Sequence, residues 1–211
     1  MFARFFSRML QPPASQCQVC RTWPAQPVCD ACVAEFAQPQ PRCRTCAALR
    51  LAAVPYAFPW AHLMADFKFN EQPALAGFFA HLLKATPWVE PALEAADLLL
   101  PMPLSSQRLQ QRGYNQALLL ANHLSASKTR TDLLLRVVDT PAQHGLKRAQ
   151  RLTALNQAFA VDPLKVSTVK GAQLVLVDDV MTTGASLNTA ARVLKAAGAS
   201  HITGLVVART E

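Results

Sequence analysis

The chain has 211 residues, enough for one ordinary domain with a hydrophobic core and a small accessory module. Hydrophobic residues make up 51% and charged residues 16%, which excludes a disordered chain and a coiled coil, and the formal net charge is +8. No uncharged apolar run reaches the ~18 to 20 residues of a membrane-spanning helix, because Asp178 and Asp179 interrupt the most promising stretch. We therefore expect a folded protein without a membrane span.

The first ten residues, MFARFFSRML, combine aromatic residues with two arginines. A secretory signal needs an apolar core of ~7 to 15 residues, and Arg8 interrupts that core here. We expect an N-terminal arm that packs Phe5, Phe6 and Leu10 on the body of the protein, with a frayed tail as the alternative. Together with reduced cysteines, the lack of a leader predicts a cytoplasmic protein.

All six cysteines lie in the first 46 residues, where they form three Cys-x-x-Cys pairs. Each such turn brings two thiolates to one point, and two turns complete the tetrahedral sulfur shell that zinc prefers. A disulfide framework is the alternative, but it suits secreted domains, and a redox Cys-x-x-Cys ordinarily occurs once. We therefore predict a structural zinc site. The pairs are Cys17 and Cys20, Cys29 and Cys32, and Cys43 and Cys46.

The spacing of the pairs favours one arrangement without settling it. Only eight residues separate Cys20 from Cys29, so we expect the first two pairs to form a single site. Cys43 and Cys46 then either replace one of these pairs or help to bind a second ion. A closed shell of four sulfurs leaves no position for water, so no catalytic role follows.

From about residue 51 the sequence changes to longer periodic elements, so we divide the chain into a zinc-binding module, residues 1–50, and a larger domain, residues 51–211. Residues 66–70 form a short segment of mixed character. Apolar periodicity and apolar runs predict helices over 73–86 and 115–126 and strands over 97–100 and 133–138.

The C-terminal third has the clearest pattern. Residues 173–177 form a β-branched and leucine run, typical of a strand covered on both faces, and residues 185–197 repeat apolar residues at helical spacing. Residues 202–208 return to a strand pattern. Strand, helix and strand in this order form a βαβ unit, so we predict an α/β fold with a parallel sheet and flanking helices.

Acidic and hydroxyl residues follow the first of these strands, at the carboxyl end where open α/β sheets bind ligands. Asp178 and Asp179 can accept hydrogen bonds from two vicinal hydroxyls, as on a ribose, or hold a hydrated divalent cation. The following turn, TTGAS, supplies hydroxyls and backbone N–H groups at a helix N-terminus, which suits a phosphate monoester. These groups in this order predict a ribose bound beside a 5′-phosphate.

Three other interpretations of this turn compete with that one. Ser186 or Thr183 can cap the helix, which explains one hydroxyl but neither acid. The two acids can form a plain metal site. A nucleotide-binding P-loop is excluded, because the sequence G-x-x-x-x-G-K-[ST] does not occur in the chain.

Residues 174–186, LVLVDDVMTTGAS, resemble the thirteen-residue phosphoribosyl pyrophosphate motif of type I phosphoribosyltransferases: four apolar residues, two acids and a Thr/Gly/Ser turn. Together with residues 101–116 (PMPLSSQRLQQRGYNQ), residues 143–159 and the cysteine pairs, they resemble the ComF family of competence-associated proteins across nearly the whole chain. The resemblance implies a type I phosphoribosyltransferase fold preceded by a zinc-binding segment. It also implies phosphoribosyl pyrophosphate with Mg²⁺ as the ligand.

The resemblance implies roles for single residues as well. Asp178 and Asp179 would bind the ribose 2′ and 3′ hydroxyls. Arg108 and Arg112 would bind pyrophosphate. Lys68 would be a phosphate-loop lysine, with an ordinary edge-strand charge as the alternative. The 5′-phosphate would lie in the turn made by Met181, Thr182, Thr183, Gly184, Ala185 and Ser186.

The chain departs from the family pattern in three places. Tyr114 stands where the family sequence Arg-Gly-Phe-Asn-Gln has phenylalanine, and Ser186 stands where threonine is commoner, which keeps the hydroxyl. Relatives often have four cysteine pairs where this chain has three, a difference that bears on whether two zinc ions bind.

Positive charge is concentrated around the implied pyrophosphate segment. Residues 101–151 carry eight basic and two acidic residues, whereas residues 61–100 carry two basic and five acidic ones. Lys147, Arg148 and Arg151 can neutralise a pyrophosphate or follow a nucleic-acid backbone. We predict single-stranded DNA as a partner, with a solvated basic face as the alternative.

Two functions are therefore carried as hypotheses. The first is a phosphoribosyltransferase that releases pyrophosphate when an unidentified acceptor attacks the ribose, through positioning and charge stabilisation. The second is a non-catalytic single-stranded nucleic-acid-binding protein that keeps the pocket as a ligand sensor or structural site. With either function, the resemblance implies a role in competence and DNA uptake or utilisation, with proteins of the competence machinery as partners.

Overall fold

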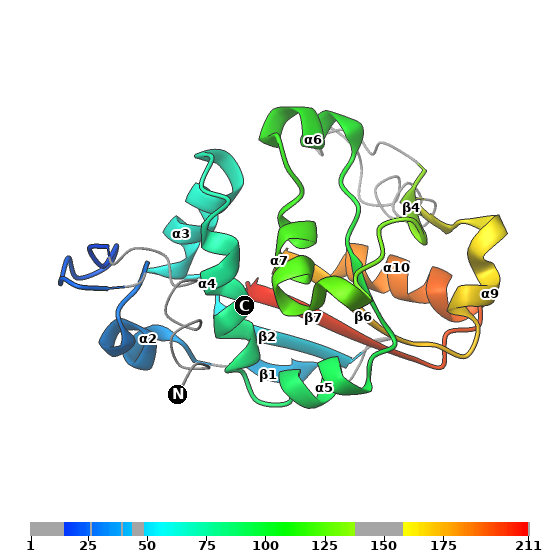
Figure 1. Ribbon diagram of the computed structural model, residues 1–211, viewed down its shortest axis with the longest axis horizontal. Helices are drawn as coiled ribbons and strands as arrows, with labels where there is room; N and C mark the ends of the chain where they lie inside the picture. Colours follow the sequence, from blue (N-terminus) through cyan, green and yellow to red (C-terminus); the bar gives the residue numbers. More distant parts are fainter. Residues whose placement is uncertain (1–14, 26, 39, 44–48, 138–157, 211) are drawn as a thin grey trace, which may run out of the picture. The chain divides into compact units, whose positions relative to one another are not determined.

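The computed structural model describes the chain except residues 1–14, 26, 39, 44–48, 138–157 and 211 (Figure 1). It contains two compact units, residues 1–38 and residues 39–211. The N-terminal arm expected from Phe5, Phe6 and Leu10 lies outside the described residues. Within the described part of the chain, no helix has the length and apolar character that crossing a membrane requires.

The boundary between the two units falls earlier in the chain than residue 50, where the sequence places it. Strand β1, Gln40–Cys43, pairs antiparallel with β2, Leu49–Pro55, and therefore belongs to the sheet of the larger unit. Periodicity does not reveal this strand, because it has four residues and includes a proline. Cys43 consequently lies in the larger unit, and Cys46 lies outside the described residues.

In its described residues, 15–25 and 27–38, the smaller unit has a short bridge and one helix. Ser15 and Ala25 form an isolated antiparallel bridge in which each backbone N–H donates to the other residue's carbonyl at 2.7 Å. Helix α2, Asp30–Phe36, follows, with Cys29 at its N-cap. Cys17 and Cys32 are buried in this unit, and Cys20 is exposed.

Among the described residues of the larger unit, five strands form the main sheet, in the order β1-β2-β7-β6-β3. Strands β2, β7, β6 and β3 run parallel, and β1 is an antiparallel edge strand. The remaining bounds are β3 Leu98–Pro101, β6 Gln173–Met181 and β7 His201–Arg209. The predicted strands over 97–100, 173–177 and 202–208 and the parallel sheet are therefore confirmed.

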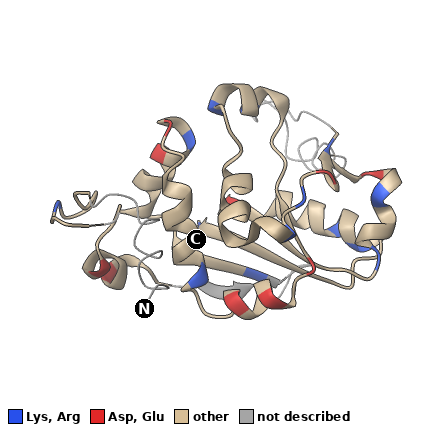
Figure 2. Ribbon diagram, in the orientation of Figure 1, with Lys and Arg blue, Asp and Glu red and all other residues tan. Residues whose placement is uncertain are grey.

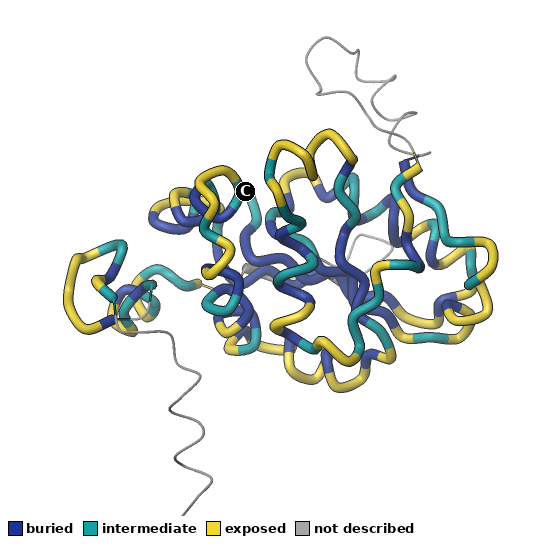
Figure 3. Tube along the Cα trace, turned by 45° about the horizontal axis from the view of Figure 1, so that its top comes forward, coloured by how far each residue is buried: buried dark blue, intermediate teal, exposed yellow. Residues whose placement is uncertain are grey.

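Residues 174–177 of β6 are all buried, so both faces of this strand are covered, as the apolar run predicts. Leu174 and Leu176 belong to the same core cluster as Leu187 and Leu194 of helix α10, Ala185–Ala196. The two valines between and after these leucines point to the other face, because side chains alternate along a strand. Figure 3 shows buried stretches along the strands and exposed ones in the connecting turns.

Helices flank the sheet on the way from strand to strand. Helix α4, Leu75–Lys84, contacts β2 and β7; α7, Gln116–Ser125, contacts β3 and β6; and α10 contacts β6 and β7. These three helices confirm the predictions over 73–86, 115–126 and 185–197. The remaining elements are α3 Trp60–Phe69, α5 Val89–Ala95, α6 Ser106–Arg112 and α9 Val166–Val169, with 3-10 turns Ala126–Lys128 and Pro163–Lys165.

A second sheet of two strands lies outside the main one. Strand β4, Leu134–Arg136, pairs antiparallel with β5, Phe159–Val161. The strand predicted over 133–138 is therefore present, but it is shorter and belongs to this separate ladder. Strand β5 contacts α10, so the β4–β5 ladder lies next to the helix that follows β6.

Candidate functional site

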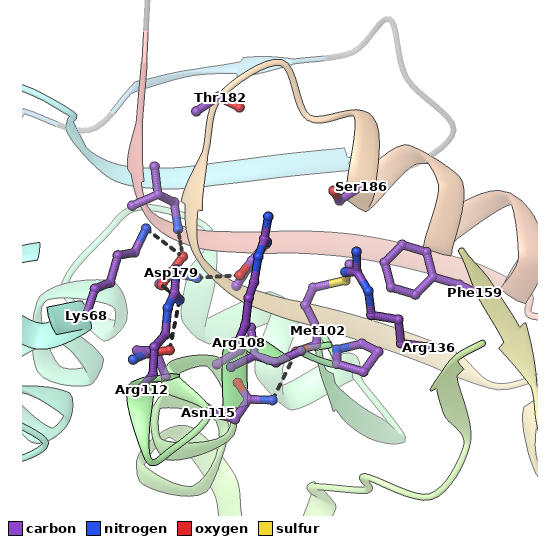
Figure 4. Close-up of a pocket in the computed structure, with 16 residues that line it drawn as sticks. Lys68, Met102, Arg108, Arg112, Asn115, Arg136, Phe159, Asp179, Thr182 and Ser186 are labelled. Atoms are coloured by element: carbon purple, nitrogen blue, oxygen red, sulfur yellow. Dashed lines mark hydrogen bonds and ion pairs between the residues drawn. The ribbon is translucent and has the colours of Figure 1, made fainter. Parts of the chain in front are cut away.

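A cavity of about 220 Å³ opens at the carboxyl end of β6 (Figure 4). Its walls come from α3, from the segment between β3 and α6, from α6 and α7, from the β4–β5 ladder and from the start of α10. The charged side chains that line it come from elements far apart in the sequence. They are Lys68, Arg108, Arg112, Arg136, Asp178 and Asp179.

Asp179 is the centre of the ion pairs in this cavity. The Nζ of Lys68 lies 3.2 Å from its Oδ1, and the Nη1 of Arg112 lies 3.9 Å from its Oδ2. Its Oδ1 also accepts the backbone N–H of Val180 at 2.6 Å. Asp179 is only 7% exposed, so its charge is balanced by two cations where water provides little solvation.

The neighbouring acid, Asp178, has a different environment. Burial and then the negative charge of Asp179 raise the pKa of Asp178 to about 7, although the N–H of Asp179 and the charges of Lys68 and Arg112 act in the opposite direction. That N–H donates to Asp178 Oδ1 at 2.9 Å. Asp178 can therefore change its protonation state near neutral pH, a property common at ligand-binding sites.

Lys68 and Arg112 reach the acids from helix ends. Lys68 is in the last turn of α3, so the alternative of an edge-strand charge is wrong. Arg112 is the last residue of α6, where its Nη1 donates to Gln116 Oε1 at 3.1 Å and its guanidinium lies 5.2 Å from the ring centroid of Phe69. The amide and the ring fix the direction of the guanidinium. Arg108, also on α6, lines the same cavity.

Residues 114–116 hold these helix ends together. The hydroxyl of Tyr114 donates to the carbonyl of Phe67 in α3 at 2.5 Å, so the departure from the family's phenylalanine adds a hydrogen bond here. Asn115 is the N-cap of α7: its Oδ1 accepts the N–H of Leu118 at 3.3 Å, and its Nδ2 donates to the carbonyl of Met102 at 3.1 Å. The segment joins α3, the β3–α6 connection and α7 around the cavity.

The turn after β6 contributes two of its six predicted residues to the cavity wall, Thr182 and Ser186. The hydroxyl of Thr183 instead accepts the N–H of Ala185 at 3.3 Å, a local hydrogen bond just before α10. Gly184 is the N-cap of α10 with a φ of +69°, a conformation that favours glycine. Met181 is buried at the end of β6.

Two arginines that sequence reasoning does not single out take part in this region. Arg50 of β2 is 5% exposed and donates from Nη2 to the carbonyl of Gly184 at 3.2 Å and from Nη1 to the sulfur of Met181 at 3.4 Å. Arg136 of β4 lines the cavity itself. Both residues interrupt apolar strand sequences, LRLAAV and LLLRVV, and this interruption is the signal that could have revealed them.

The three basic residues predicted to contact nucleic acid, Lys147, Arg148 and Arg151, lie outside the described residues. Their role stays a prediction.

The smaller unit contains a separate group of potential metal ligands. The Sγ atoms of Cys17, Cys20, Cys29 and Cys32 lie within 4.8 Å of one another, and all four are free thiols. Burial acts to raise the pKa of Cys17, but backbone N–H groups, among them that of Cys29, outweigh it and lower the pKa to about 6; burial and the neighbouring sulfurs raise the pKa of Cys32 to about 12. Four sulfurs this close can hold a metal ion, which would favour the thiolate form of each.

Comparison with known proteins finds a matching family model for part of the larger unit and relatives that match most of the chain. The family model described as a phosphoribosyl transferase domain matches residues 111–210, which include β6, the turn and α10. The DNA utilization protein YhgH of Salmonella typhimurium is 30% identical over 208 residues, covering 92% of this chain and 90% of the relative. Competence protein F of Haemophilus influenzae is 33% identical, covering 70% of this chain and 66% of its own length.

Two further matches are shorter. Competence protein ComFC of Bacillus subtilis is 36% identical over 110 residues, covering 50% of this chain and 43% of the relative. A solved structure of the allosteric regulatory enzyme of purine biosynthesis aligns with 67% of this chain and 29% of its own, with 16% identity and a TM-score of 0.43. The fold assignment rests on the sheet and on the family match.

Proposed function

The chain belongs to the ComF family, and from this premise we propose that its cavity binds phosphoribosyl pyrophosphate with Mg²⁺ and that the protein transfers the phosphoribosyl group to an acceptor. One observation carries the proposal. Two carboxyl groups, the turn into α10 and four basic side chains line a single cavity at the carboxyl end of a buried parallel strand. A ribose that carries phosphate groups at both ends needs this combination of groups.

Each part of the ligand finds a complementary group. Asp178 and Asp179 would accept hydrogen bonds from the ribose hydroxyls, and Arg108, Arg112 and Lys68 would balance the charge of the pyrophosphate. The hydroxyls and N–H groups from Met181 to Ser186, including Thr182, Thr183, Gly184 and Ala185, would surround the 5′-phosphate. Carboxylate oxygens are ligands that Mg²⁺ accepts, so the two acids fit a hydrated ion that would neutralise part of the pyrophosphate charge.

The reaction would be a displacement at the first ribose carbon. A nucleophilic atom of the acceptor forms a bond to that carbon, the bond to the pyrophosphate oxygen breaks with its electron pair, and the acceptor loses a proton to solvent. No side chain needs to form a covalent bond. The residues of the cavity would hold the reactants and stabilise the charge that develops on the leaving pyrophosphate.

We further propose zinc as the metal of the four-cysteine group in the smaller unit. Zinc–sulfur distances of ~2.3 Å in a tetrahedral shell are compatible with sulfurs that lie within 4.8 Å of one another. A small unit has little hydrophobic core, so the metal would supply much of its stability. The site would be structural.

The names of the relatives connect them to competence and DNA utilization, and we propose such a role for this chain, with single-stranded DNA and proteins of the competence machinery as partners. The alternative, a non-catalytic nucleic-acid-binding protein, predicts that the cavity binds its ligand without turning it over. Pyrophosphate release separates these two functions.

The test is release of labelled pyrophosphate from phosphoribosyl pyrophosphate across a panel of nucleobases and nucleic acids, together with the melting-temperature shift that the ligand causes. Asp178→Asn with Asp179→Asn is expected to abolish both signals. Glu90→Gln with Glu94→Gln is the matched control: it removes two negative charges from α5, which lies at the opposite side of the larger unit from α6 (Figure 2). An unchanged melting shift in the first variant would reject the proposed site.

A further inference from the structure

The basic side chains of the cavity line different parts of its wall. On one side, Lys68 and Arg112 both pair with Asp179, at 3.2 and 3.9 Å. On the other side, Arg136 lies near Phe159 and below Ser186 (Figure 4). The family resemblance described above assigns no role to Arg136 or to Phe159.

Arg136 is held by the ladder from which it extends. It is the register partner of Phe159, and its guanidinium carbon lies 5.5 Å from the centroid of that ring. Phe159 is 4% exposed, so the ring is a fixed support, and the N–H of Val137 donates to the carbonyl of Ala158 at 2.9 Å, which extends the pairing by one step. A ring fixes the orientation of a guanidinium that stacks on it, and Arg136 lines the cavity wall.

The position of the β4–β5 ladder indicates which charged group of the ligand Arg136 would bind. Strand β5 contacts α10, and Ser186 is the second residue of α10, a helix of twelve residues. The N-terminus of such a helix favours negative charge, and here a hydroxyl and a guanidinium join it at one end of the cavity. Asp179, which is proposed above to bind the ribose, lies with Lys68 and Arg112 and away from Arg136 (Figure 4).

We infer that Arg136, with Ser186 and the N-terminus of α10, recognises the terminal phosphate monoester of the sugar, and that Lys68 and Arg112 serve the pyrophosphate end. The inference rests on the proposed function for the identity of the sugar. Its physical basis is that the two charged ends of phosphoribosyl pyrophosphate are attached to opposite sides of the ribose ring. A planar guanidinium suits a phosphate because two N–H groups can bind two oxygens at once. Arg136 would thus make the site select 5-phosphorylated ribose over unphosphorylated ribose.

The experiment uses probes that each carry one end of the ligand. Calorimetric titrations of the full chain with ribose 5-phosphate, and separately with magnesium pyrophosphate, are made for the wild type, Arg136→Met and Lys68→Met. Arg136→Met is expected to weaken ribose 5-phosphate binding at least tenfold and to leave pyrophosphate binding within about twofold. Lys68→Met is expected to do the reverse. Arg192→Met removes an exposed arginine from α10 and controls for net charge.

Several outcomes overturn the inference. If Arg136→Met loses affinity for ribose 5-phosphate and for pyrophosphate equally, Arg136 only supports the ladder. If Arg136→Met keeps its full affinity for ribose 5-phosphate, the inference is rejected as well. Arg136→Lys keeps the charge without the planar fork, so it replaces the methionine variant if that variant fails to fold. Its affinity for ribose 5-phosphate is expected to lie between those of the wild type and Arg136→Met. If the wild type binds ribose 5-phosphate but neither pyrophosphate nor phosphoribosyl pyrophosphate, the proposed function fails while the phosphate subsite stands. If the wild type binds none of the three, both are rejected.

Discussion

The guanidinium of Arg50 occupies the space that a side chain on residue 184 would need. A Cβ placed on Gly184 would overlap the Nη1 of Arg50, which is buried below the turn and donates from Nη2 to the carbonyl of Gly184. The positive φ of residue 184 favours glycine, and a side chain there would also force the Arg50 guanidinium to move. Arg50 thus connects strand β2 to the turn after β6 through its hydrogen bond to Gly184.

This relationship predicts the effect of Gly184→Ala. The positive φ alone costs about 1 kcal/mol, and displacing the buried guanidinium adds to it, so we expect a loss of roughly 2 to 4 kcal/mol in the free energy of unfolding. Gly171→Ala is the matched control, because Gly171 has a φ of +79° and a Cβ added there would meet no atom within 4 Å, and we expect a loss of about 1 kcal/mol. Denaturant unfolding measures both.

A double variant tests the cause. If Arg50 is the obstacle, Arg50→Ala should partly relieve Gly184→Ala, and the two losses should sum to more than the loss in the double variant. Strictly additive losses would mean that the backbone conformation alone explains the effect.

Asp178 makes stability depend on pH. Its pKa in the folded chain is about 7, above the ~3.9 of an unfolded aspartate, so between these values the folded state holds a proton that the unfolded state has released. This contribution is fully present below about pH 4 and is lost as the pH rises through 7. The wild type therefore loses this stability as the pH rises, whereas Asp178→Asn does not. Without divalent ions, the free energy of unfolding of Asp178→Asn should increase relative to that of the wild type by roughly 2 to 4 kcal/mol from pH 4 to pH 8.

The measurement is the free energy of unfolding at several pH values. Glu94→Gln, an exposed acid of α5, is the control and should follow the wild type throughout. A difference between Asp178→Asn and the wild type that is constant from pH 4 to pH 8 would contradict the raised pKa.

The sequence predicts the parallel sheet because β6 and β7 are apolar enough to be read directly, and α10 has a regular apolar stripe. It predicts the acids and the turn for the same reason: they follow a recognisable strand. It does not predict Arg136, because the register of β4 with β5 joins residues on either side of residues 138–157, and periodicity carries no information about such pairing. The family resemblance brings Lys68 to the site, but its position at the end of a helix depends on α3, which the short, mixed sequence around it conceals.

The four-cysteine group predicts about one metal ion per chain. Cys17→Ser with Cys20→Ser removes two of four sulfurs and should release the ion, because two remaining thiolates cannot complete a tetrahedral shell. Cys43→Ser is the informative control: Cys43 is in strand β1 of the larger unit, and we expect this variant to keep its metal. Elemental analysis of the purified proteins gives the answer. Metal loss in Cys43→Ser would mean that the third pair replaces one of the first two.

The basic residues Lys147, Arg148 and Arg151 predict binding of single-stranded DNA through phosphate contacts. Counterion release makes the logarithm of the binding constant fall with the logarithm of the salt concentration, with a slope of ~0.7 for each phosphate neutralised on a single strand. Replacing all three residues with alanine should therefore flatten the slope by about two units. Titrations of wild type and variant at several salt concentrations measure it.

A second triple variant separates local contacts from overall charge. Lys170, Arg192 and Lys195 are exposed in the described part of the chain, and replacing them with alanine lowers the net charge by the same amount. If phosphates bind at Lys147, Arg148 and Arg151, the control keeps a slope close to that of the wild type, because counterion release counts the phosphates contacted and not the total charge of the protein. Equal slopes in all three proteins would reject a nucleic-acid role for the predicted segment. Equal flattening in both variants would assign the effect to the general field of a basic protein, which acts on the encounter with DNA and not on a defined site.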